Sequence, residues 1–280
     1  MKRLLGILLA LALLGGSALA AEALPVGAFT RIGDGQRIDL DGDGSAETVR
    51  FRANNSDYDG ASFSVGVGDL SIDGEADYLT EELYAARFQG VEGALLFVSD
   101  YGPSDDYVSY VYHYVRDYEG VARLDDLGWV GGFPQYMEVT GPNTFTTYVR
   151  GDLLLTWFRP ADYVIAAGYY YGDDFTVEYA LAEVPRDIYP VGAHVTLRMD
   201  LPLMASRVDS TVARVLHKGE QAVVAGSDDV EWVYIAAIDP EYGEAAGGWV
   251  RMERGSYYSM FVGKKKVDAM DVMDGLLQAD

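Results

Sequence analysis

One short segment of the sequence concentrates side chains that can bind a metal ion. The stretch Asp39-Leu40-Asp41-Gly42-Asp43-Gly44-Ser45-Ala46-Glu47 places carboxylates at its first, third, fifth and ninth positions. Calcium is a hard cation that takes about six to eight oxygen ligands, and alternating carboxylates on a tight loop supply several of them. Gly44 permits a sharp bend, and the Ser45 carbonyl offers a further oxygen. The segment therefore predicts a Ca²⁺ site with the ligands Asp39, Asp41, Asp43, Ser45 and Glu47.

The flanking residues indicate which type of calcium loop this is. An EF-hand loop ends in glutamate at its twelfth position, which is Arg50 here, and residues 48–52 alternate like a strand. The nine-residue spacing between strands resembles the calcium loop of FG-GAP/VCBS repeats, found in integrin-type β-propellers, although Glu47 stands where aspartate is commoner. The alternative is a solvated acidic turn. Because four crowded carboxylates repel one another, a bound cation is the simplest remedy.

Other acidic segments carry less specific patterns. Residues 100–106 lie between two predicted strands and either hold a second cation, face a ligand or form a Gly-Pro turn, which is favoured. Three adjacent pairs can be interpreted as the carboxylates of a glycosidase: Asp125-Asp126, Asp173-Asp174 and Asp228-Asp229. Such pairs are expected by chance among 44 carboxylates, and the sequence has no GxSxG elbow, HExxH pair or phosphate-binding loop. We therefore expect a non-catalytic protein, with a polysaccharide- or peptidoglycan-acting hydrolase as the alternative.

Composition excludes several classes of function. The 44 acidic residues outnumber the 21 basic ones, so a basic face for nucleic acid or anionic lipid is not expected. The chain has no cysteine, which removes disulfides, thiolate metal sites and cysteine nucleophiles. His113, His194 and His217 are far apart in the sequence and are expected to serve structure or surface.

The first twenty residues predict a secretory signal peptide. Lys2 and Arg3 form a short positive region, residues 4–14 an apolar stretch, and Ala18-Leu19-Ala20 a small-residue cleavage site. The apolar stretch is short for a transmembrane helix and ends at Gly15-Gly16, with an uncleaved anchor as the alternative. The expected location of the mature chain is secreted, either extracellular or at the cell envelope, with no membrane span after cleavage.

Charge and aromatic content divide the mature chain into two domains. Residues 21–185 contain 29 acidic residues, 9 arginines, 16 tyrosines and no lysine, whereas residues 186–280 contain 15 acidic residues, 10 basic residues and 5 tyrosines. Prolines at 185 and 190 mark the boundary. We predict an acidic β domain over 21–185, a linker over 186–192, a second domain over 193–256 and a tail over 257–280.

Both domains are predicted to be built from strands. Alternating or apolar runs favour strands at 48–52, 63–67, 93–98, 107–115, 144–149, 153–158, 163–167 and 175–181, and Asp73-Gly74 is a hairpin signal. In 107–115 both faces carry apolar side chains, which indicates a central strand. Helical spacing appears only at 79–88 and at 267–277, where apolar residues fall on one side.

The second domain resembles bacterial SH3-like (SH3b) domains over residues 193–254. The matching fragments are 197–198, 206–210, 216–226, 231–235 and 247–250, with Lys218-Gly219 as a turn and Gly248 as a close approach between strands. Trp232 and Trp249 are expected in the barrel core. The segment 202–204 and the acidic insertion 239–246 depart from the family. The resemblance implies an interaction module for cell-wall peptides or glycans, with a purely structural partner domain as the alternative.

Together these features predict an all-β protein. The first domain is expected to be propeller-like or a stack of antiparallel sheets, because residues 26–185 provide at most about four blades of 40–45 residues and no repeat is visible. A small SH3-like barrel and a short C-terminal helix follow. The expected function is calcium-stabilised binding or adhesion at the cell envelope, to a cell-wall peptide, a glycan or another envelope protein.

Overall fold

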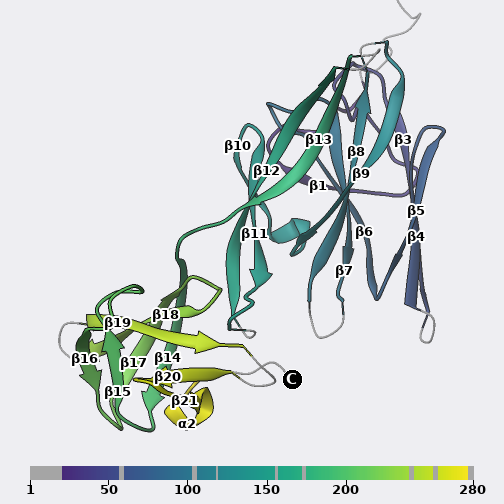
Figure 1. Cartoon of the computed structure of the whole chain (residues 1–280). Helices are drawn as coiled ribbons and strands as arrows, with labels where there is room; N and C mark the ends of the chain where they lie inside the picture. The colour runs from purple at the N-terminus through teal and green to yellow at the C-terminus, as the bar shows by residue number, and fades with distance from the viewer. Residues whose placement is uncertain are drawn as a thin grey trace, which may run out of the picture.

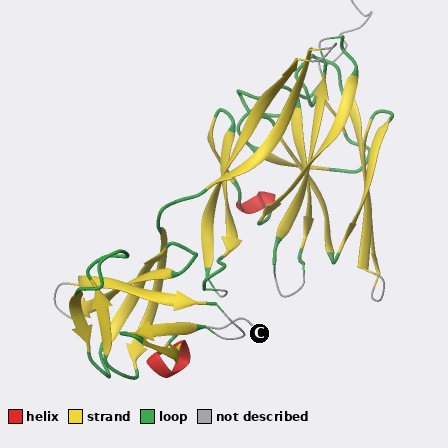
Figure 2. Ribbon diagram, viewed as in Figure 1, coloured by secondary structure: helices red, strands yellow, loops and turns green. Residues whose placement is uncertain are grey.

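The computed structural model describes residues 21–56, 60–102, 106–117, 119–154, 157–171, 175–239, 243–254 and 258–276. The predicted signal peptide lies outside these residues. The described chain consists of antiparallel sheets with a single short α-helix, so the all-β prediction is confirmed (Figures 1 and 2). None of these sheets closes on itself. Within the described residues, no helix has the length and apolar character needed to cross a membrane.

The N-terminal part contains three sheets that lie side by side (Figure 1). The first sheet has the order β2(Arg37–Ile38), β3(Glu47–Ser56), β4(Gly60–Val67), β5(Leu70–Ala76). The central sheet has the order β1(Phe29–Ile32), β6(Leu79–Ala86), β7(Ala94–Asp100), β8(Val108–Arg116), β9(Ala122–Gly131). The 3₁₀-helix η2(Pro134–Tyr136) leads to the third sheet, of order β10(Glu138–Gly141), β11(Thr144–Arg150), β12(Phe158–Tyr171), β13(Phe175–Val184).

The central sheet is buried on both faces because its strands alternate two sets of apolar side chains. Leu96 and Val98 of β7 join a first core shared with the first sheet. Leu95 and Phe97 join a second core shared with the third sheet. All seven residues of β7 are buried, and β8 likewise presents apolar side chains to both cores. The prediction of a central strand at 107–115 is therefore confirmed.

The prediction of a helix at 79–88 is wrong, because this segment is strand β6. Leu79 and Leu83 reach the same core, as the residues of a helix would. A spacing of four is also an even number, and residues an even number apart share one face of a strand. The register shifts between Leu79 and Leu83, and Glu81 adopts a positive φ of 57°. This bulge hides the simple alternation in the sequence.

Two further turn and strand predictions need correction. Asp73-Gly74 lies inside β5 rather than in a hairpin turn. Glycine is required there because a Cβ at position 74 would collide with the ring of Phe63. The predicted strand 153–158 is absent up to Leu154, and β12 begins at Phe158. Leu153 and Leu154 are apolar because they are buried in the core of the C-terminal sheet.

The C-terminal part forms one nine-stranded sheet around an aliphatic core. Its main path is β16(Val212–Leu216), β15(Leu201–Met204), β19(Gly243–Glu253), β18(Trp232–Asp239), β17(Gln221–Ser227), β14(Tyr189–Leu197), β22(Met273–Asp274), and β20(Ser259–Val262) and β21(Lys265–Asp268) extend it from β19. Strand β14 already begins inside the range predicted as linker. The predicted tail helix is confined to α2(Ala269–Val272), after which β22 pairs with β14. The tail is nevertheless docked, because Val272 and Met273 are buried in this core.

Residues of the SH3-like fragments differ in how they pack. Gly219 turns the chain between β16 and β17 with a φ of 89°, and a Cβ at Gly248 would approach the Met204 carbonyl to 2.7 Å. Both glycines therefore have the roles predicted from the sequence. Trp232 and Trp249 are only half-buried and lie outside the aliphatic core. Trp249 packs against Tyr234 at a ring distance of 5.2 Å instead.

A buried ion pair joins the three N-terminal sheets, termed the stacked sheets below, to the C-terminal sheet. Arg159 Nε of β12 donates to Asp229 Oδ2 at 2.6 Å, and Arg159 Nη1 donates to Glu183 at 2.6 Å. Asp229 Oδ1 also accepts the backbone N–H of Leu153 at 3.0 Å. The guanidinium of Arg159 lies 4.5 Å from the ring centre of Tyr189. The two parts of the chain thus share a built junction rather than a bare linker.

Candidate metal centre

The acidic loop connects two short paired strands. Ile38 of β2 pairs with Glu47 of β3, so the intervening residues form the turn of a hairpin. Gly42 and Gly44 adopt φ values of 82° and 89°, a conformation that costs glycine little and other residues more. The two glycines let the chain reverse direction tightly enough to bring alternate carboxylates together.

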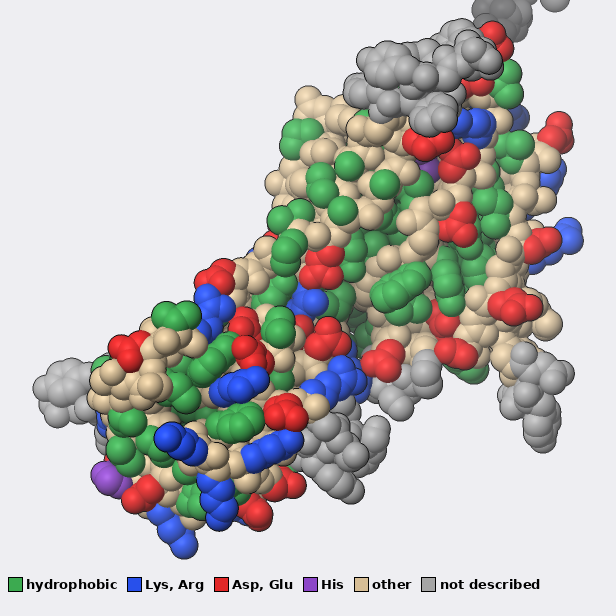
Figure 3. Space-filling model, in the orientation of Figure 1, with side chains coloured by type: hydrophobic (Ala, Val, Ile, Leu, Met, Phe, Trp, Pro, Cys, Tyr) green, Lys and Arg blue, Asp and Glu red, His purple; other side chains and the backbone are tan. Residues whose placement is uncertain are grey.

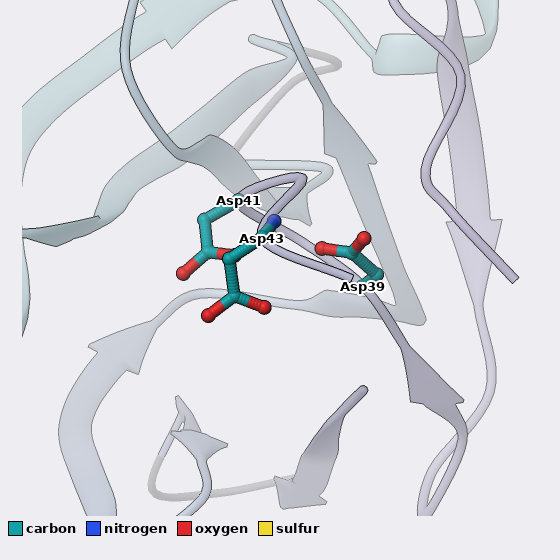
Figure 4. Close-up of side chains that lie close together, drawn as sticks. All are labelled: Asp39, Asp41 and Asp43. Carbon is teal, nitrogen blue, oxygen red and sulfur yellow. The ribbon is translucent and has the colours of Figure 1, made fainter. Parts of the chain in front are cut away.

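Three of the predicted ligands meet in this turn. One carboxylate oxygen from each of Asp39, Asp41 and Asp43 lies within 4.8 Å of the other two. Figure 4 shows the carboxylates of Asp41 and Asp43 pointing the same way, with Asp39 entering the loop from the other side. Asp39 is buried, Asp41 is half-buried and Asp43 is exposed. The cluster therefore opens to solvent on one side, which gives an ion a route in.

Backbone N–H groups hold the three carboxylates in place. Asp39 Oδ1 accepts from Gly42 at 2.6 Å, and Asp39 Oδ2 accepts from Gly44 at 3.0 Å. Asp41 Oδ1 accepts from Asp43 at 3.1 Å, and Asp43 Oδ1 accepts from Ser45 at 2.6 Å. The Ser45 N–H lowers the pKa of Asp43, with a smaller contribution from Arg116. The loop is thus ordered by its own backbone.

Ser45 and Glu47 are placed differently from the three aspartates. Ser45 is exposed and contributes its N–H to Asp43. Glu47 is buried, and its Oε2 accepts the Leu40 N–H at 3.0 Å. Burial raises the pKa of Glu47, while the Leu40 hydrogen bond acts in the opposite direction. Its carboxylate closes the base of the loop, next to the three aspartates rather than among them.

Sequence reasoning missed two arginines that contact the loop. Arg116, the last residue of β8, donates from Nε to Asp41 at 2.6 Å and from Nη2 to Glu47 at 3.0 Å, and its Nε lies 3.6 Å from Asp43. Arg87 Nη2 donates to the Asp41 carbonyl at 3.0 Å. A Cβ at Gly42 would meet the Arg87 guanidinium, which would have to shift, so the need for glycine here comes mainly from its positive φ.

Arg116 and Arg87 balance part of the negative charge that, from the sequence alone, was expected to require a bound cation. The hydrogen bond to Asp41 is the main cause that raises the pKa of Arg116, so this group is charged at any physiological pH. Four carboxylates against two guanidinium groups leave two negative charges, the charge of one divalent cation. All the side-chain donors are carboxylate oxygens, which suit hard cations such as calcium or magnesium rather than soft metals. The donor set therefore fits calcium without being specific to it.

The other acidic segments have structural partners. Asp100 is buried and accepts the N–H groups of Asp77, Tyr78 and Gly102, while residues 103–105 lie outside the described part. Asp125 pairs with Arg123 at 3.2 Å, and Asp126 accepts the Gly128 N–H at 2.8 Å.

The two carboxylates of Asp228-Asp229 bind different partners. Asp228 accepts three N–H groups of the β17–β18 turn, and Asp229 binds Arg159. Asp173-Asp174 lies outside the described residues. His113 is buried and donates from Nε2 to the Glu92 carbonyl at 2.7 Å, whereas His194 and His217 are exposed.

Comparison with models of known protein families, with curated proteins and with solved structures finds no match to this chain.

Proposed function

We propose that this protein is a secreted, calcium-stabilised and non-catalytic binding or adhesion protein of the cell envelope. In this proposal the three stacked sheets are a propeller-like domain whose calcium ion is structural. The C-terminal sheet is an SH3-like barrel that binds a cell-wall peptide, a glycan or another envelope protein. The observation that carries the proposal is the meeting of Asp39, Asp41 and Asp43 on one backbone-ordered turn.

A structural role for calcium is supported by the position of the loop. Asp39 and Glu47 are buried beside the first core, to which the neighbouring Ile38, Leu40 and Val49 belong. An ion held by the loop would tie the end of β2 to the start of β3. The excess of two negative charges supplies the driving force, because a divalent cation relieves the repulsion between the carboxylates.

The envelope location is supported by the N-terminal sequence and by the composition. The three-part leader directs a chain to secretion, and the charge of −23 suits a protein that avoids nucleic acid. The SH3-like assignment is supported by the turn at Gly219 and the close strand approach at Gly248.

Thermal unfolding of the mature chain with and without calcium tests the proposal. Extracellular calcium modules have dissociation constants of about 0.1–1 mM. With about 1 mM calcium and a constant near 0.1 mM, linkage adds roughly 1.4 kcal/mol, which raises the Tm by about 3–6 °C. Chelator should abolish this rise, and magnesium, which demands a stricter octahedral geometry, should reproduce it poorly.

Matched variants make the thermal test specific to the loop. Asp41→Ala and Asp43→Ala should each remove most of the calcium response. Asp69→Ala removes an exposed carboxylate from the β4–β5 turn of the same sheet and should leave the response intact. An equal loss in all three variants, or no calcium response in the parent protein, would refute the calcium proposal.

A further inference from the structure

Exposed aromatic side chains gather at one end of the stacked sheets. The strands of the central sheet meet there at Leu79, Asp100, Val108 and Gly131, while Arg116 and the acidic loop lie at the opposite end. Large rings beside these ends and beside the neighbouring β11–β12 ends are 38–64% exposed: Tyr78, Tyr101, Trp129, Tyr148 and Phe158. Exposed apolar side chains gathered in one place indicate a surface that binds a ligand or another protein.

Three of these rings form a continuous series with the half-buried Tyr107 and the buried Phe133. We term this series the aromatic ladder: Tyr78, Tyr101, Tyr107, Phe133 and Phe158. The ring centres of Tyr78 and Tyr101 are 5.9 Å apart, and Tyr101 lies 5.2 Å from Phe133. Tyr107 stacks on Phe133 at 4.6 Å and on Phe158 at 6.0 Å. The ladder thus crosses from the β5–β6 turn to the start of β12.

A buried carboxylate keeps the exposed half of the ladder in position. Asp100 is 1% exposed and accepts the N–H of Tyr78 at 2.7 Å and that of Gly102 at 2.9 Å. These bonds hold the backbone on either side of the Tyr78–Tyr101 contact. A ring surface that is ordered before binding loses little entropy when a ligand is placed on it.

A polar depression of about 720 Å³ adjoins the aromatic end. It is lined among others by Asn54, Ser56, Glu75, Asp77 and Tyr110. This volume lies within the range of small-ligand sites. Asp77 lines this depression and directly precedes Tyr78 of the ladder. Tyr110, which also lines it, is paired with Trp129 across β8 and β9, so these two rings share a face of the sheet. Hydrogen-bonding oxygens and amides therefore stand directly beside exposed rings.

The charge of this domain limits the ligand. Residues 21–185 have no lysine and 29 acidic residues against 9 arginines, and basic side chains are conspicuous on the C-terminal part in Figure 3. An anionic polymer would be repelled. A sugar has apolar faces that stack on aromatic rings, and hydroxyl groups that hydrogen-bond to carboxylates, amides and hydroxyls. The aromatic end offers both kinds of partner side by side. We propose that the aromatic end binds an uncharged or amino-bearing polysaccharide chain.

This inference gives the proposed binding protein a ligand and a site, and it does not require the calcium loop. Isothermal titration of the mature chain with cellohexaose, chitohexaose, the fully deacetylated chitosan hexamer and oligogalacturonate tests it. Saturable binding is expected for at least one of the first three and not for oligogalacturonate. No binding of the first three below about 10 mM, or preference for oligogalacturonate, overturns the proposal.

Variants locate the site. Tyr78→Ala and Tyr101→Ala should each weaken binding by about 2- to 12-fold, as expected for loss of one aromatic contact. Tyr136→Ala is the matched control, because Tyr136 is 65% exposed but belongs to η2 and not to the ladder. Equal effects in all three variants, or none, place sugar binding elsewhere and overturn the proposal. A cooperative thermal transition at an unchanged Tm without calcium shows that the ladder variants remain folded, and the calcium-dependent rise in Tm tests the calcium proposal separately.

Discussion

Replacing Asp229 by alanine should uncouple the stacked sheets from the C-terminal sheet. Asp229 is 7% exposed and is the partner of both Arg159 and the Leu153 N–H across the junction. Burial alone would lower the pKa of Arg159, but its hydrogen bonds with Glu183 and Asp229 raise it, so the guanidinium stays charged. The substitution leaves a buried charge with one partner instead of two.

The cost follows from these contacts. Removing one partner of a buried ion pair destabilises a protein by about 3–5 kcal/mol. Arg159 keeps Glu183, which reduces this figure, whereas Leu153 loses the acceptor of a buried N–H, which adds about 1–3 kcal/mol. We therefore expect the free energy of unfolding to fall by about 3–5 kcal/mol.

Urea unfolding and limited trypsin digestion measure the effect. Arg186 lies between β13 and β14, where trypsin can cut once the junction opens. We expect cleavage after Arg186 to be at least about tenfold faster in the variant, because cleavage follows the population of the open form. Asp152→Ala is the control: Asp152 meets Arg254 at 3.4 Å with a 75% exposed side chain, so the change should stay within about 0.5 kcal/mol. A loss below about 1 kcal/mol for Asp229→Ala, with unchanged digestion, would refute the reasoning.

Three further predictions concern single positions. Arg116→Gln should lower the metal-free stability by about 1–2 kcal/mol and enlarge the rise in Tm with calcium, since the carboxylates lose a counter-ion; a smaller rise would contradict this. Burial lowers the pKa of His113, so the unfolded chain binds a proton that the folded chain does not as the pH falls below about 6.5. Stability should therefore decline from pH 7 to 5.5, and His113→Gln should flatten this part of the urea-unfolding profile. Gly93→Ala should cost more than Gly120→Ala in urea unfolding, because both have positive φ but only at Gly93 would a Cβ meet a carbonyl oxygen, that of Tyr114.

The strands that are buried on both faces were the most predictable part of the fold. In β7 and β8 both faces of the strand carry apolar or aromatic side chains, so burial does not depend on which face meets which core. The helix predicted at 79–88 failed because a bulge at Glu81 interrupts the alternation, and bulges leave no simple period in the sequence. Leu153 and Leu154 were misassigned because their burial depends on a sheet formed by residues after 188.

The acidic loop was predictable because its ligands are close in sequence and its glycines accept positive φ. Arg116 and Arg87 were not predictable, because the end of β8 and the residue after β6 come to the loop from 75 and 46 positions away from Asp41. The aromatic ladder was equally hidden. Its five rings come from the β5–β6, β7–β8 and β9–η2 connections and from the start of β12, and only the packing of the sheets brings these together.

Direct titration of calcium into the mature chain tests the central claim. The loop predicts one saturable site per chain with a dissociation constant of about 0.1–1 mM. Asp43→Asn, which keeps the size of the side chain and removes the charge of an exposed ligand, should weaken binding markedly. Titration heat that is indistinguishable from dilution up to about 10 mM calcium, well above that range, would show that the loop is an acidic turn whose charge the arginines partly balance.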